Sequence, residues 1–176
     1  MSLTLASIQA AADDNSLFQL LSDELSEQFP PELQQDRERF LLALKKAPPG
    51  LRSMAGTHDL DGSMALDDLA WHFLNHNDER FLRETVSSLR QLEAAEAAEV
   101  FLVAWDMVKP YLSEIRTHDW EADELHEYLD RTGIQEKVDP LSERMWAISA
   151  RCGDLGLMQF WVNYARKYPE RCVVPY

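Results

Sequence analysis

Residues 94–108 constrain the fold of this chain more than any other stretch. Twelve of them are apolar, and the three exceptions are the acids Glu96, Glu99 and Asp106. At 100° per residue these acids lie within about 80° of one another, so a helix here is apolar around most of its circumference. The stretch is too short to span a membrane, which needs about 20 nearly uninterrupted apolar residues. It therefore predicts the buried central helix of a globular domain.

Helical periodicity continues on both sides of this stretch. Apolar residues recur at spacings of three and four, and no segment keeps the two-residue alternation of a β-strand for long. The predicted helices cover 16–29, 31–47, 63–75, 78–92, 94–108, 121–131, 140–152 and 155–168. We therefore expect an all-α fold, a compact domain of about eight helices with short connections. It forms a single domain over 1–176, in which a helical hairpin at 16–47 packs on a core at 63–168.

Capping and breaker residues predict where these helices begin and end. Ser16 starts a capping-box pattern, Asn77 precedes the helix at 78–92 as its cap, and Asp154 is placed to cap the last helix. Pro140 directly after an aspartate predicts a helix start. Residues 51–62 contain two glycines and no sustained period, so they predict the longest loop of the molecule.

The cysteines and the first residues indicate a cellular compartment. Cys152 and Cys172 lack CxxC spacing, which favours reduced thiols over a redox pair. No Lys or Arg precedes Arg37, and no run of seven apolar residues opens the chain, so we expect no secretory signal. The sequence predicts a cytoplasmic protein without membrane association.

Charge is the property that bears most on function. The chain has 31 acidic and 17 basic residues and a formal net charge of −14. Such a surface repels nucleic acid and anionic membranes and attracts basic partners, although acidity also serves solubility. The acids concentrate in three segments: 13–38 carries −7, 59–79 carries −6 and 114–143 carries −7, while the rest carries +6.

Acids with helical spacing can imitate a nucleic acid. Carboxylates three or four residues apart on a helix lie about 5–6 Å from one another, which is comparable to successive phosphates on a strand. A ridge of such acids can occupy a basic DNA-binding groove, and salt weakens the contact strongly. Trp120, within a charged segment, is the predicted aromatic anchor. The predicted partner-binding residues are Asp67, Asp68, Asp119, Trp120, Glu121, Asp123, Glu124, Glu127 and Asp130.

Two patterns have the spacing of metal sites. His72 and His76 are spaced i, i+4, with Asp68 one turn earlier, but the glutamate of an HExxH motif is absent. Residues 57–68 approximate a calcium loop whose first ligand position holds a threonine. An ordinary helix end and a polar loop explain these patterns more simply. We therefore predict no metal and no other cofactor.

The sequence contains no recognisable catalytic motif. It lacks a G-x-S-x-G elbow, a P-loop and a G-x-G-x-x-G turn. A metal-dependent helical hydrolase that uses the histidines and acids at 68–76 or 118–127 remains a competing hypothesis. A solvated acidic face explains these residues more simply.

Residues 68–105 resemble the central part of a family of small, acidic, all-helical bacterial proteins that includes a dimeric DNA mimic. In that family a glycine-led motif of Gln, two aromatics and Asn precedes a helix, a small-residue hinge and an alanine-rich helix. The matching residues here, 71–75, read Trp, His, Phe, Leu and Asn, without the glycines or the Gln. A closer copy of the motif, 156–163, lies near the C-terminus, out of order. The resemblance implies an all-helical fold, a capacity to dimerise and competition with DNA for a basic protein.

These observations favour a non-enzymatic acidic interaction protein. We expect it to bind a basic protein, such as a DNA-binding regulator, by DNA mimicry and not to bind nucleic acid itself. An immunity-type protein that neutralises a basic toxin or nuclease is the alternative within the same class.

Overall fold

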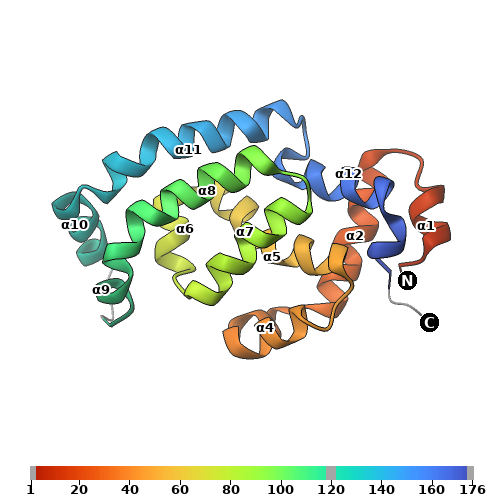
Figure 1. The fold of residues 1–176 in the computed structure, drawn as a ribbon, viewed down its shortest axis with the longest axis horizontal. Helices are drawn as coiled ribbons and strands as arrows, with labels where there is room; N and C mark the ends of the chain where they lie inside the picture. The colour runs from red at the N-terminus through yellow and green to blue at the C-terminus, as the bar shows by residue number, and fades with distance from the viewer. Residues whose placement is uncertain (1–2, 118–121, 174–176) are drawn as a thin grey trace.

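The computed structural model of this chain describes residues 3–117 and 122–173, without the side chains of 122, 123 and 126 (Figure 1). Within these residues there is no β-strand, so the predicted all-α class is confirmed. The helices are α1 (Leu5–Ala10), α2 (Asp14–Gln28), α3 (Pro31–Gln35), α4 (Arg37–Leu44), α5 (Pro49–Leu66), α6 (Leu69–Asn75), α7 (Glu79–Gln91), α8 (Ala95–Val108), η1 (Lys109–Tyr111), α9 (Leu112–Thr117), α10 (Ala122–Thr132), α11 (Ile134–Arg151), η2 (Gly156–Met158), α12 (Gln159–Lys167) and η3 (Pro169–Arg171).

Helix α8 is the buried central helix that the sequence predicts. It lies between α7 and α11, and Figure 1 shows α11 running along it for most of its length. Phe101, Ala104 and Val108 are fully buried. One side remains open to solvent, where Val103 and Met107 are 45% and 42% exposed. The open side is narrow because α6, α7 and α11 pack against the other sides of α8.

Two hydrophobic clusters form the core. The larger cluster extends from the second half of α5 through α6, α8 and α11, and Phe73 meets Phe101 in it with ring centroids 5.0 Å apart. The smaller cluster joins α1, α2, α4 and the first half of α5 to α12, where Trp161 is fully buried. The two ends of the chain therefore pack together, and α5 and α7 contribute side chains to both clusters.

The predicted loop at 51–62 is wrong, because these residues lie inside the 18-residue helix α5. Gly56 allows α5 to pack closely on α7: a Cβ at this position would lie 2.4 Å from the Ser88 hydroxyl oxygen. Thr85 on α7 donates a hydrogen bond to the Gly56 carbonyl at 3.0 Å. The glycine that suggests a break in sequence is therefore a helix–helix contact.

Three predicted N-termini are displaced by nearby aspartates. Asp13, and not Ser16, caps α2, and it accepts the Ser16 backbone N–H at 2.7 Å. Asp78 rather than Asn77 caps α7. The helix predicted from residue 63 begins only at Leu69, because 63–66 belong to α5. An aspartate carboxylate is an effective N-cap, and Asp13, Asp68 and Asp78 define the starts of α2, α6 and α7.

Two predictions near the C-terminus also need correction. Pro140 does not start a helix but lies inside α11, which begins six residues earlier, after Gly133 in the left-handed conformation (φ 61°). Ile134 and Val138 anchor that first part of α11 in the core, which explains why the proline is tolerated. Asp154 does not cap α12, because the turn η2 separates them.

Glu93, the single residue between the predicted helices 78–92 and 94–108, lies in a tight turn between α7 and α8. Glu93 has a φ of 63°, and the Ala94 N–H donates to the Leu89 carbonyl at 2.9 Å, as in a Schellman motif. The Glu93 carboxylate accepts hydrogen bonds from Lys167 Nζ at 2.7 Å and from the Tyr168 hydroxyl at 2.9 Å. The turn is therefore fastened to the C-terminal end of α12.

None of the helices that can be described is long and apolar enough to cross a membrane.

Candidate functional site

Acids from two distant segments meet where α6 begins beside α11. Asp68 caps α6 and accepts the Trp71 backbone N–H at 3.0 Å. The Gln135 side-chain amide donates a hydrogen bond to the other carboxylate oxygen of Asp68. The same amide nitrogen also donates to Asp139 Oδ1 at 2.8 Å. The Leu69 N–H donates to the Ser142 hydroxyl at 3.2 Å. We call Asp67, Asp68, Asp139 and Glu143 the acidic junction.

Basic residues do not neutralise the acidic junction. Within residues 3–117 and 122–173, its four members form no ion pair. Several bases pair with acids on other surfaces instead, including Arg151 with Glu96 and Lys167 with Glu93. The junction therefore keeps its negative charge.

Two large apolar side chains are exposed beside the acidic junction. Leu66, at the end of α5, is 85% exposed, and Trp146 on α11 is 42% exposed. The Trp146 indole N–H donates to the Met64 carbonyl at 2.8 Å, which holds the ring against the end of α5. Trp146 lies inside the predicted helix 140–152, where an aromatic residue is expected to belong first to the core, and its exposure shows that this expectation is wrong. A helical wheel could have identified it, because it points roughly 110° from the mean direction of the buried residues of α11.

The predicted binding residues on α10 are only partly described. Glu124, Glu127 and Asp130 are exposed and follow one another at three-residue spacing. The predicted residues Asp119, Trp120 and Glu121 lie outside the described residues, as does the side chain of Asp123.

The three acidic segments do not form one continuous face. Figure 1 shows α10 at the end of the molecule where α11 begins, and α2, within the segment 13–38, at the opposite end. Gln135 connects the segment 59–79 to the segment 114–143. Gln135 thus brings acids of two segments together, while the segment 13–38 meets the segment 59–79 through a base, Arg37, which lies 3.6 Å from Asp59.

The paired histidines are part of a buried polar cluster. His72 is fully buried, and its Nδ1 lies 2.9 Å from the Ser63 hydroxyl. Its ring centroid is 4.9 Å from that of His76. His76 Nδ1 lies 3.3 Å from an Asp59 oxygen and 3.2 Å from an Arg37 nitrogen. Residues from α4, α5 and α6 therefore meet at this cluster.

The charges in this cluster are set by burial. Burial lowers the pKa of His72 to about 3, with a smaller contribution from His76. Burial also lowers the pKa of His76, although Asp59 opposes the shift. Burial alone would raise the pKa of Asp59, but His58, His76 and Arg37 outweigh it, and the net shift is downward. Burial thus keeps the imidazoles of His72 and His76 neutral at neutral pH, next to an ionised Asp59.

The structure gives no support to the two metal hypotheses. No group of three His, Cys, Asp or Glu in the described parts of the chain could hold a metal ion. Asp68, the third ligand suggested for His72 and His76, is occupied with Trp71 and Gln135. The stretch 57–68 is helical up to Leu66, so it forms neither a calcium loop nor the polar loop that the sequence favours. The acid/base group suggested at 118–127 lies largely outside the described residues.

Zinc is therefore expected to leave the melting temperature of the protein unchanged. His72 is inaccessible, and His76 is already paired with Asp59. Thermal unfolding with equimolar zinc, with calcium and with a chelator measures this directly. A saturable rise in melting temperature with either metal would contradict the assignment of these residues to the core.

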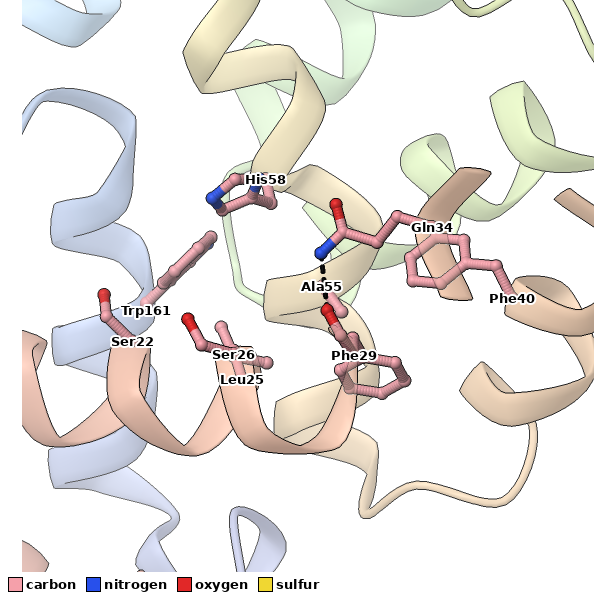
Figure 2. A pocket seen from close by; sticks show the side chains of 9 residues that line it. All are labelled: Ser22, Leu25, Ser26, Phe29, Gln34, Phe40, Ala55, His58 and Trp161. Atoms are coloured by element: carbon pink, nitrogen blue, oxygen red, sulfur yellow. Dashed lines mark hydrogen bonds between the residues drawn. The ribbon is translucent and has the colours of Figure 1, made fainter. Parts of the chain in front are cut away.

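A small cavity lies between α2, α5 and α12. Figure 2 shows His58 and Trp161 above Ser22 and Ser26. Gln34 lies on the side of the cavity opposite Trp161. The cavity measures about 60 Å³, enough for a few water molecules but small for a substrate. No hydrogen bond joins His58 to either serine in the described structure, so the geometry does not form a nucleophile–base pair.

No family model matches this chain, and no curated protein or solved structure matches it either. The resemblance of residues 68–105 to an acidic, all-helical family therefore stays a prediction.

Proposed function

We propose that this protein is a non-enzymatic interaction protein that binds a basic partner through the acidic junction and the exposed acids of α10. The observation that carries the proposal is the position of Gln135, which holds the Asp68 and Asp139 carboxylates close together. Carboxylates held near one another repel, and a cationic partner relieves that repulsion when it binds. No described base does so in the free protein.

Leu66 and Trp146 provide the apolar area that such an interface needs. Charge complementarity accelerates association and selects partners, but the centre of most interfaces is a buried aromatic or aliphatic anchor. Trp146 is held by the Met64 carbonyl and so presents a fixed surface. We therefore expect a partner segment that combines Lys or Arg with an apolar side chain.

The spacing of Glu124, Glu127 and Asp130 supports a DNA-binding protein as the partner. Acids three residues apart on one helix have a separation comparable to that of successive phosphates. Duplex DNA should then compete with this protein for the partner, and salt should weaken both complexes. A captured nuclease or toxin would instead favour the immunity-type alternative.

Reversing the charge of the acidic junction is expected to abolish partner capture. The variant Asp67→Lys, Asp139→Lys, Glu143→Lys should reduce capture of basic proteins from source lysate by about tenfold or more at low salt. These three residues are exposed, so the helical circular-dichroism signal should not change.

A matched control on another surface distinguishes this effect from a general loss of charge. The variant Asp23→Lys, Glu27→Lys, Glu32→Lys changes the net charge by the same amount on the exposed surface of α2 and α3. It should retain most of the capture. Equal losses in the two variants, or capture that does not depend on salt, would contradict the proposal.

A further inference from the structure

A hollow of about 560 Å³ lies between α7 and α8 and differs from the rest of this acidic protein. Arg83 and Arg90 line it, Val86, Leu102 and Trp105 form its apolar wall, and no acidic residue lines it. Its volume is within the range of small-molecule sites, roughly 300–1,000 Å³. The hollow shares no residue with the acidic junction.

Trp105 places an unsatisfied donor at this hollow. The side chain is only 5% exposed, and its indole nitrogen has no hydrogen-bond partner among the residues that the structure describes. Buried indole N–H groups usually have an acceptor. A ligand that reaches this nitrogen must therefore offer a hydrogen-bond acceptor, and Trp105 shares the hollow with two arginines.

The cations around Trp105 are free to turn toward an anion. The Arg83 guanidinium carbon lies 5.6 Å from a Trp105 ring centroid, and Lys109 Nζ lies 5.7 Å from one. Both side chains are at least half exposed. The acid that each of them pairs with is Glu79, whose Oε1 lies 3.6 Å from an Arg83 guanidinium nitrogen and 3.6 Å from Lys109 Nζ, which is longer than a usual hydrogen bond. Arg90 is exposed and forms no ion pair within the described ranges.

We propose that this hollow binds a small organic anion, a carboxylate or phosphate attached to an apolar group. Arg83 and Arg90 bind the oxyanion, and movement of Arg83 and Lys109 off the ring uncovers the Trp105 N–H for one of its oxygens. The apolar part of the ligand packs on Val86 and Leu102. This activity is separate from partner binding and stands whether or not the acidic junction binds a basic protein.

Phenyl phosphate is a suitable probe, and the indole N–H signals of the ¹⁵N-labelled protein report its binding. The chain has five tryptophans, and Trp105→Phe identifies the signal of Trp105. We expect phenyl phosphate to shift that signal saturably and to leave the Trp146 and Trp161 signals in place. No saturable shift of the Trp105 signal with phenyl phosphate or with benzoate would overturn the proposal.

Arginine variants test the site without altering the core. Arg83→Gln with Arg90→Gln should weaken phenyl phosphate binding by about tenfold or more, because charge-assisted hydrogen bonds are lost. The matched variant Arg39→Gln with Lys46→Gln removes two exposed charges from the α4 region and should bind as the wild type does. Equal affinity in the two variants would overturn the assignment of the arginines.

Further ligands resolve the chemistry of the site. Benzoate shows whether a carboxylate replaces the phosphate, and binding of either organic anion supports the proposal. Inorganic phosphate lacks the apolar group and should bind more weakly, while neutral benzyl alcohol should not shift the Trp105 signal. Inorganic phosphate binding as tightly as phenyl phosphate, or benzyl alcohol giving the same shift, would show that no organic anion is selected.

Discussion

Replacing Phe101 with alanine is expected to lower the free energy of unfolding by about 3–5 kcal/mol, which is the usual cost of removing a buried phenyl ring. Phe101 is fully buried at the middle of α8, and its ring centroid lies 5.0 Å from that of Phe73 and 5.4 Å from that of His72. The cavity left behind would lie at the centre of the larger hydrophobic cluster. Urea denaturation followed by circular dichroism measures the change.

Val103→Ala on the same helix is the matched control. Val103 is 45% exposed, so its loss should cost less than about 1 kcal/mol. Both substitutions leave an alanine in α8, and they differ in the burial of the side chain and in the number of atoms that are removed. Equal destabilisation by the two variants would contradict the position of α8 at the centre of the fold.

The second large effect is a dependence of stability on pH that arises from His72. Burial lowers its pKa in the folded protein from 6.5 to about 3. Between these values the unfolded chain binds a proton that the folded chain does not, so acid favours unfolding. With respect to His72, the folded protein therefore keeps its full free energy of unfolding above about pH 6.5. As pH falls below this value, His72 alone lowers that free energy by up to about 1.4 kcal/mol per pH unit.

His72→Gln should flatten this slope. The variant is expected to be less stable than the wild type at pH 8, because it disturbs the contact with Ser63, but it should lose less stability between pH 6 and pH 4. His58→Gln is the control. The His58 side chain is 53% exposed, and Asp59 raises its pKa, so protonation of His58 favours the folded state, whereas protonation of His72 favours unfolding. Urea denaturation across this pH range gives both slopes. A wild-type slope retained in His72→Gln would contradict the role of His72.

The fold class and the central helix could be predicted because they depend on local pattern. The nearly continuous apolar surface of 94–108 requires burial wherever the chain places it. Helix α5 could not be predicted in the same way. Gly56 breaks a helix in isolation, and only the approach of Ser88 on α7 shows that its missing side chain is required for packing.

The candidate site was less accessible to sequence reasoning than the fold. Charge counts identify Asp67 and Asp68 as candidates, and neither of them pairs with a base in the described structure. The contact between Asp68 and Gln135 joins residues 67 positions apart, and no local pattern encodes it. The unsatisfied Trp105 nitrogen is likewise visible only once its neighbours are in place.

The turn at Glu93 determines how the hollow between α7 and α8 responds to a ligand. Its left-handed residue and its contacts with Lys167 and Tyr168 hold the two helices at one angle. Only exposed side chains therefore rearrange on binding, and such rotamer changes take picoseconds to nanoseconds. Association should consequently follow a single exponential whose rate rises linearly with ligand concentration, without the plateau that a slow opening of the helix pair would impose.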